Sequence, residues 1–126
     1  MERVTGIGGV FLRARDPVAL AAWYREHLGL PIEPGKPYGT LTAAASGRPE
    51  QTVWSAFPPD TDYLGSPASS FMVNYRVDDL AAVLAALRAE GCTVEDKTED
   101  SEFGKFGWVI DPEHNKVELW QPPPGM

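Results

Sequence analysis

The sequence has little of several features that would narrow its function at once. Its 126 residues include one cysteine, which excludes an internal disulfide, and a lone thiol is typical of a protein from a reducing cytoplasm. An apolar run of about 18 residues and a charged-then-apolar leader are both missing, so we expect neither a membrane span nor secretion. Basic residues are scarce, with 11 Lys and Arg against 18 Asp and Glu and a net charge of −7. Such an acidic chain is not expected to bind nucleic acid or an anionic membrane.

What is present is the composition of an ordinary globular domain. Hydrophobic residues make up 43% of the chain and charged residues 23%, which is typical of a soluble protein. The chain is long enough to bury one hydrophobic core. The single cysteine, Cys92, follows Gly91 between an expected helix and an expected strand, so we interpret it as small buried filler. We therefore expect one cytoplasmic domain spanning residues 1–126.

The first recognisable unit is a strand followed by a helix. Residues 8–16, GGVFLRARD, alternate in character and carry Val, Phe and Leu, which is typical of a strand. Asp16 has the position of a helix N-cap, Pro17 suits the first helical position, and Gly29 suits the residue after the helix. The apolar residues of the expected helix follow at helical spacing, at Leu20, Trp23, Tyr24 and Leu28.

A second unit repeats this order. Residues 71–79, FMVNYRVDD, form another expected strand that ends in Asp78 and Asp79 as caps. The helix after it should end at Gly91. An offset of 63 matches Arg13 to Arg76 and Asp16 to Asp79. The apolar face of this second helix comprises Leu80, Val83, Leu84 and Leu87.

Strand-like segments follow both helices. They are YGTLTAAA and QTVWSAF in the first half, and TVEDKTE, FGKFGWVI and KVELW in the second. The segment at residues 58–70 is rich in Pro, Gly, Ser and Asp and reads as a connection. Each half is too small to bury a core alone. We therefore predict an α+β fold in which two βαβββ modules, about 1–57 and 71–122, share one domain.

Two motifs carry a resemblance to a known family. The segment DPVALAAWYREHLGL and the ending DPEHNKVELW resemble signatures of the vicinal oxygen chelate superfamily, which contains glyoxalase I, extradiol dioxygenases and bleomycin-resistance proteins. The resemblance covers nearly the whole chain. It implies a cup-shaped mixed sheet with the helices on its outer face and a homodimer. In the enzymes of that superfamily it further implies a divalent metal inside the cup, held by two His and one or two Glu.

The ligand positions that this resemblance implies are mostly occupied by other residue types. The first histidine position falls on Gly9, and its repeat in the second module falls on Met72. The third position lies within residues 54–56, Trp-Ser-Ala, and the fourth is Glu118. A catalytic divalent ion needs at least three protein ligands. We therefore expect no metal and no other cofactor, and a metal-dependent dioxygenase is disfavoured.

The two histidines of the chain do not restore such a site. His27 lies in the last turn of the first helix, where a basic side chain suits the helix dipole. His114 takes a turn position at which the family motif has glycine, and histidine tolerates left-handed backbone better than most residues. We interpret both as structural residues.

The interior of the cup can be predicted from strand alternation. Side chains two positions apart share a face, and Glu118 shares its face with Trp120. Arg13 and Arg76 could neutralise Glu118 or bind a substrate carboxylate. Glu118 has four open roles, as a relic of a metal site, an Arg partner, a hydrogen-bond acceptor for ligand or a general base. The predicted ligand-binding residues around it are Phe11, Arg13, Trp54, Met72, Asn74, Arg76, Trp108 and Trp120.

These residues form an apolar and aromatic set with a few polar groups, which is typical of a small-molecule site. The first hypothesis is a metal-free small-molecule-binding protein that holds an aromatic or amphipathic ligand. Bleomycin-type drug binding is its sharpest version, although the two arginines would oppose a cationic ligand. The second hypothesis is an enzyme, a glyoxalase-like lyase or isomerase that uses Glu118 as base or residual metal ligand.

Overall fold

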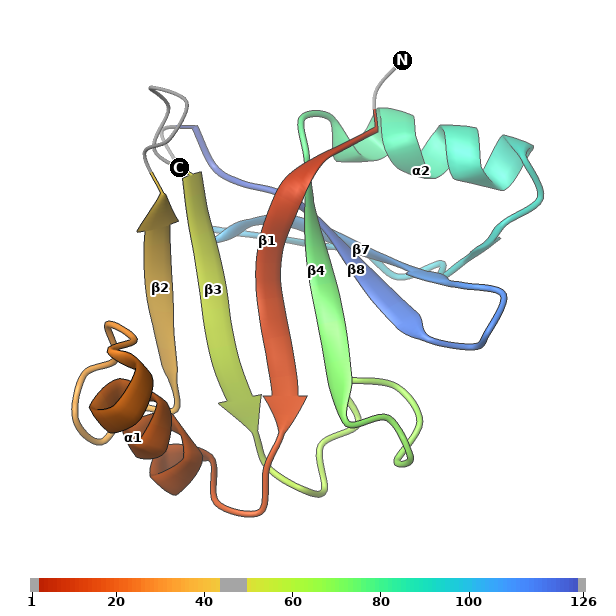
Figure 1. Cartoon of the computed structure of the whole chain (residues 1–126). Coiled ribbons are helices and arrows are strands. Elements are labelled where there is room, and N and C mark those ends of the chain that lie inside the picture. Colours follow the sequence, from red (N-terminus) through yellow and green to blue (C-terminus); the bar gives the residue numbers. More distant parts are fainter. Residues whose placement is uncertain (1–2, 44–49, 125–126) are drawn as a thin grey trace. The chain divides into compact units, whose positions relative to one another are not determined.

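The computed structural model describes residues 3–43 and 50–124 of the chain (Figure 1). The described residues form two helices and eight strands. In chain order they are β1 (Val4–Arg13), α1 (Pro17–Leu28), β2 (Tyr38–Ala43), β3 (Glu50–Phe57), β4 (Phe71–Val77), α2 (Leu80–Ala89), β5 (Thr93–Val94), β6 (Glu99–Ser101), β7 (Gly104–Ile110) and β8 (Lys116–Gln121).

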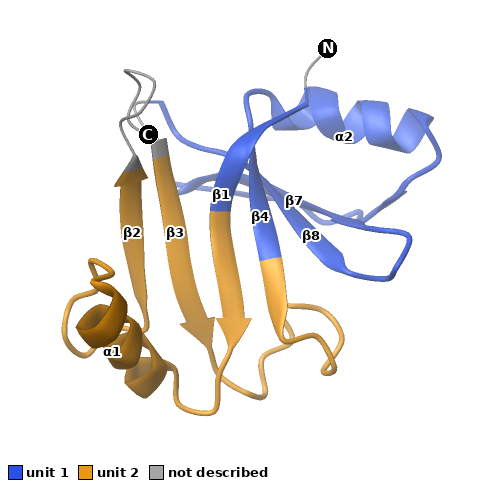
Figure 2. Cartoon of the chain, in the orientation of Figure 1, with its two compact units in different colours: residues 1–8, 73–126 blue, residues 9–72 orange. Residues whose placement is uncertain are grey.

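The chain divides into two compact units, coloured separately in Figure 2. Unit 2 comprises residues 9–72, and unit 1 comprises residues 1–8 together with 73–126. The boundaries cut through β1 and β4, so each of these strands contributes residues to both units.

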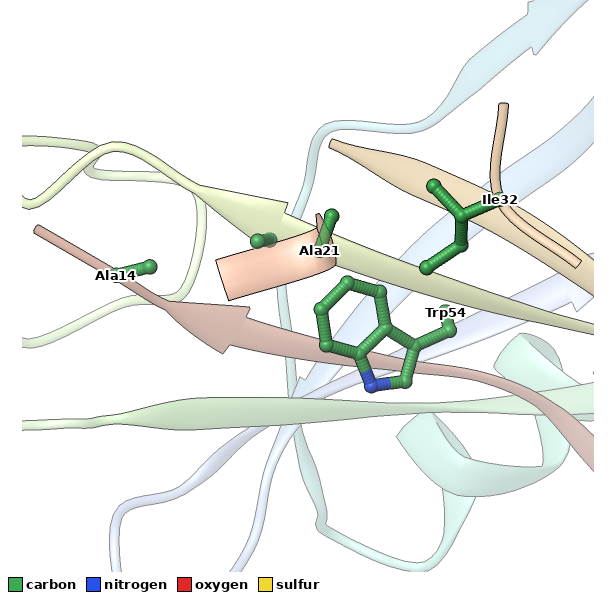
Figure 3. Close-up of a cluster of buried hydrophobic side chains, with 5 residues drawn as sticks. Ala14, Ala21, Ile32 and Trp54 are labelled. Atoms are coloured by element: carbon green, nitrogen blue, oxygen red, sulfur yellow. The ribbon is translucent and has the colours of Figure 1, made fainter. Parts of the chain in front are cut away.

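Unit 2 packs its helix against one face of three strands. β3 pairs in parallel with β1 and antiparallel with β2. Trp54 and Ala56 of β3 pack with Ala21 of α1 and with Ile32; Figure 3 labels Trp54, Ala21 and Ile32 in this cluster. Leu12 of β1 packs against the same cluster. Strand alternation places Phe11 and Ser55, which are partners in the register, on the opposite face.

The ends of α1 follow the sequence prediction, and its buried face follows it in part. The Asp16 carboxylate accepts a hydrogen bond from the Ala19 amide at 3.0 Å, and Gly29 adopts a left-handed φ of 69°. Trp23 and Leu28, which we expected on the apolar face, are 51% and 59% exposed. The interface is made by Leu20 and Tyr24, as expected, together with Ala21, which packs with Trp54 of β3.

Unit 1 repeats this arrangement with a longer set of strands. β8 pairs in parallel with β4 and antiparallel with β7, and both β5 and β6 pair with β7. The N-cap Asp79 accepts from the Ala82 amide at 3.1 Å, as predicted. The predicted apolar face of α2 is confirmed, because Leu80, Val83 and Leu84 are buried against Val77 and Leu119.

The α+β class and the repeated strand–helix–strand order are confirmed. Two strands follow α1, with an isolated bridge between Ile32 and Gly39, and four follow α2. The last predicted strand residues of YGTLTAAA lie outside the described residues. The expectation that Cys92 is buried was wrong, since its side chain is exposed. In the part of the chain that the structure describes, neither helix has the length and apolar character needed to cross a membrane.

Candidate functional site

Five of the predicted site residues lie on one face of unit 1, because Trp108 of β7 pairs with Glu118. Asn74 and Arg76 of β4 pair with Glu118 and Trp120 of β8, and paired residues of neighbouring strands share a face. The intervening residues, such as Leu119, pack toward α2. The face that carries Glu118 is therefore the one turned away from the helix, as the sequence predicted.

Glu118 is the centre of this face. Its side chain is fully buried, with 0% exposure. One carboxylate oxygen accepts a hydrogen bond from Asn74 Nδ2 at 2.6 Å, and the other accepts from Trp108 Nε1 at 2.9 Å. Trp108, the partner of Glu118 on β7, is itself 2% exposed. Burial of a carboxylate is costly unless donors meet it, and here two neutral N–H groups do so.

A second group on the same face is built around Trp120. The Arg76 guanidinium carbon lies 5.0 Å from the centre of the Trp120 ring, a cation–π contact. Phe106 of β7 lies almost parallel to that ring, with centroids 6.1 Å apart. The indole N–H donates to the Phe103 carbonyl at 2.8 Å. Trp120 is thus fixed in orientation by contacts within unit 1.

Two lysines lie beside Trp108. The ammonium nitrogens of Lys97 and Lys116 are 5.8 and 5.3 Å from its ring centroid. Sequence reasoning did not single out either one. Lys116 could have been found, because it stands two positions before Glu118 and alternation places both on one face. Lys97 could not, because it lies between β5 and β6, where four residues, 95–98, interrupt the register with β7.

A glycine, Gly8, completes this face, and sequence reasoning did not single it out. A Cβ atom at residue 8 would overlap the Asn74 amide oxygen and would lie 2.8 Å from Cε3 of Trp120. A Cβ atom at residue 9 would meet the Phe11 ring and the Val53 carbonyl instead. Gly9 therefore lies beside Phe11, with which strand alternation groups it.

The oxygen of the Asn74 amide has no hydrogen-bond donor among the described residues, although the side chain is only 2% exposed. Buried polar atoms of this kind normally have a partner. The Asn74 nitrogen is committed to Glu118. The oxygen is therefore an acceptor held in place beside the buried carboxylate.

Arg13 has a different role from the one predicted. Its guanidinium donates to four backbone carbonyls of the connection, at Pro59, Thr61, Ser66 and Ser69, over 2.7–3.3 Å. Four of its five N–H donors are thereby used. Arg13 holds the 58–70 connection within unit 2, and we withdraw it as a partner of Glu118 or of a substrate carboxylate.

The remaining predicted residues of unit 2 divide between its two faces. Phe11 contacts Phe57 and Tyr63, with ring centroids 5.4 and 6.4 Å apart. Trp54 packs in the α1 core against Tyr24, on the face opposite Phe11, so its assignment to the cup was wrong. The error came from placing a whole segment, residues 54–56, at one ligand position. Met72 is buried at 1% exposure.

The turn before β8 sets the register in which Glu118 is presented. The Asp111 carboxylate accepts hydrogen bonds from the backbone amides of Glu113 and Asn115, and its other oxygen accepts from Asn115 Nδ2, all at 2.9 Å. The hydrogen bond from the Asn115 side chain is the main reason why the pKa of Asp111 lies below its ordinary value. His114 has a left-handed φ of 67°, as expected for a residue at a glycine position of the motif.

The residues around Glu118 do not fit a divalent ion. Within residues 3–43 and 50–124, no group of three His, Cys, Asp or Glu side chains is placed to hold one. Both oxygens of Glu118 already accept hydrogen bonds from N–H groups, of Asn74 and of Trp108. His27 lies against the Trp23 ring, and His114 lies in the turn. The expected absence of a metal stays a prediction.

A cavity of about 340 Å³ lies on the other side of the unit 1 sheet. Val83 and Leu87 of α2 line it together with Tyr75 and Leu119. Because Leu119 alternates with Glu118 along β8, this cavity opens on the helix side and is distinct from the candidate site.

Comparison with known proteins agrees with this architecture. Residues 9–120 match the model of the glyoxalase-like domain. The chain belongs to this family. Comparison with curated proteins finds none that matches it.

Three solved structures illustrate the shared fold. A methylmalonyl-CoA epimerase from Mycobacterium tuberculosis is 23% identical, with a TM-score of 0.64 over 96% of this chain and 90% of the epimerase. One from Streptomyces coelicolor, in complex with 2-nitronate-propionyl-CoA, is 13% identical, with a TM-score of 0.71 over 97% of both chains. A glyoxalase/bleomycin resistance protein/dioxygenase superfamily member from Vibrio splendidus is 14% identical, with a TM-score of 0.59 over 96% of this chain and 99% of that one.

Proposed function

We propose that this glyoxalase-like protein binds a small molecule on the Glu118 face of unit 1. The observation that carries the proposal is the fully buried carboxylate of Glu118, held by Asn74 and Trp108 among aromatic side chains. Small-molecule sites combine apolar and aromatic walls with a few fixed polar groups. Trp120 and Phe106 supply the aromatic part of this face, and Glu118 with Asn74 supplies the polar part.

Two cationic side chains on this face disfavour a cationic ligand. Arg76 stacks on Trp120, and Lys116 lies against Trp108. Both would oppose a cationic drug of the bleomycin type. We therefore favour an aromatic or amphipathic ligand without positive charge, although the whole chain is acidic.

Intrinsic tryptophan fluorescence provides the test, because the four tryptophans divide into two pairs. Trp108 and Trp120 lie on the proposed face, whereas Trp54 is in the α1 core and Trp23 is exposed on α1. A ligand found in a screen of aromatic and amphipathic compounds should change the emission of the native protein. Trp108→Phe and Trp120→Phe should each remove part of that change, while Trp23→Phe and Trp54→Phe should leave it intact. A response that depends on Trp23 or Trp54 would move the site away from Glu118.

An isomerase that uses Glu118 as general base is the second candidate. It is supported by the structural likeness to methylmalonyl-CoA epimerases, which are isomerases, and by a carboxylate whose orientation is held on both oxygens. Positioned general bases contribute about 10²–10⁴-fold to rate. Glu118→Gln should therefore slow proton exchange at a substrate carbon by about 10²–10⁴-fold, while binding, measured by fluorescence, survives. A pure binding protein would catalyse no such exchange before or after the substitution.

We further propose that the chain acts as a single cytoplasmic domain, as a homodimer, and without a divalent metal. Elemental analysis after incubation with Ni, Zn, Fe(II) and Mn, followed by desalting, tests the last point. Near one metal per chain would contradict it. Sedimentation that shows a monomer would remove the dimer.

A further inference from the structure

The position of the Asn74 side chain indicates which chemical groups a ligand of the proposed site should carry. The Asn74 amide lies in the space that a side chain at residue 8 would fill, since a Cβ atom there would overlap its oxygen. The absence of a side chain at Gly8 thus leaves space for the Asn74 amide. In this position its Nδ2 donates to Glu118 at 2.6 Å.

The direction of the amide follows from its neighbour. A carboxylate only accepts hydrogen bonds, so the Asn74 nitrogen has to face Glu118 and the oxygen has to point away from it. That oxygen accepts no hydrogen bond from any described residue, although the side chain is 98% buried. Such an atom costs free energy unless something donates to it.

We propose that Asn74 is the specificity-determining residue of the proposed site and selects ligands that carry an N–H or O–H donor. The inference rests on the proposed function. Two ligands of the same shape should differ in binding free energy. A ligand with a donor gives the Asn74 oxygen a hydrogen bond, whereas a ligand without one leaves that oxygen buried and unpaired. Sites built on buried polar groups reject the analogue that lacks the matching group.

The test uses matched pairs of aromatic probes that differ in one donor. They are phenol and anisole, benzyl alcohol and benzyl methyl ether, and benzamide and N,N-dimethylbenzamide. For at least one pair, the donor-bearing member should bind the native protein about tenfold more tightly or better, measured by titration calorimetry. In Asn74→Leu, which keeps the approximate size and removes both polar atoms, the ratio should fall to about one.

A second variant tests, without any ligand, whether the Asn74 amide lies beside Gly8. Gly8→Ala should displace the amide, so the side-chain NH₂ resonances of Asn74 should shift and lose their slow solvent exchange in NMR spectra. Asn74→Ala combined with Gly8→Ala should recover much of the stability lost in Gly8→Ala, because the overlap is removed. Unchanged Asn74 resonances in a folded Gly8→Ala protein would show that the amide does not lie against residue 8.

The remaining outcomes separate this inference from the proposed function. Equal binding of both members in every pair, or discrimination that persists in Asn74→Leu, would overturn the role of Asn74 and leave the binding site standing. If the native protein binds no member of any pair while its fold is intact, the proposed function fails together with the inference.

Discussion

The two modules of this chain use the same framework for different chemistry. The offset of 63 that relates Arg13 to Arg76 also holds for the strands that pair with them. In unit 2 the register pairs Phe11 with Ser55. The corresponding pair in unit 1 is Asn74 with Glu118. The same two positions thus hold an aromatic ring and a hydroxyl in one module, and an amide and a carboxylate in the other.

The two arginines differ in the same way. Arg13 is bound by four carbonyls of the 58–70 connection. Arg76 lies on the Trp120 ring. Equivalent positions of the two modules therefore share a place on the strand but not the same contacts, because the neighbouring residues differ between the modules. The polar face arose in only one of the modules, and that is where we place the candidate site.

The largest expected effect comes from removing the carboxylate that distinguishes the modules. Glu118→Ala leaves the buried donors of Asn74 and Trp108 unpaired and opens a cavity. Each unpaired buried donor costs about 1–3 kcal/mol, so we expect a loss of about 3–5 kcal/mol in the free energy of unfolding. The matched change Ser55→Ala should cost less than about 1 kcal/mol. Urea denaturation measures both, and similar losses would contradict the comparison.

A smaller effect is expected at the arginines. Arg13→Met removes four hydrogen bonds that hold the connection, two of them partly buried and two exposed. The two partly buried bonds should carry most of the effect, at about 1–1.5 kcal/mol each. We expect a loss of about 2–3 kcal/mol and faster proteolysis within residues 58–70. Arg76→Met should leave cleavage of that segment at the native rate. Protection of the segment in Arg13→Met would show that other contacts hold it.

The turn before β8 should add a pH dependence to the stability of unit 1. The folded-state pKa of Asp111 is lowered, so its hydrogen bonds stabilise the fold above the ordinary pKa of 3.8 and this contribution is lost as the pH falls through the lower, folded value. Thermal unfolding of the native protein and of Asp111→Ala should differ at pH 6. The difference should shrink below pH 3.8, and a constant difference would exclude this linkage.

The smallest effect concerns the residue at the glycine position of the motif. His114 adopts a left-handed φ, which costs a side chain about 1 kcal/mol relative to glycine. His114→Gly should raise the free energy of unfolding by about 0.5 kcal/mol, because the added freedom of the unfolded chain offsets part of the gain. His27→Gly is the matched control and should destabilise the protein, since that residue is inside α1.

Much of the fold could be predicted because its signals are local. The caps at Asp16 and Asp79, the left-handed Gly29 and the period of α2 all depend on residues close in sequence. The exposed face of α1 could not be predicted in the same way. Trp23 has helical spacing with Leu20, and only the packed sheet determines that Ala21 is the contact residue.

The candidate site likewise has features that the sequence predicts and features that it does not. The family resemblance, the repeat and the face shared by Asn74, Arg76, Glu118 and Trp120 could be predicted from the sequence, because a strand has a period of two whatever it packs against. The folded chain was needed to show that Gly8 accommodates the Asn74 amide, that Trp54 belongs to the α1 core and that Arg13 holds the connection. Those contacts join residues far apart in sequence, and no local pattern records which of them meet.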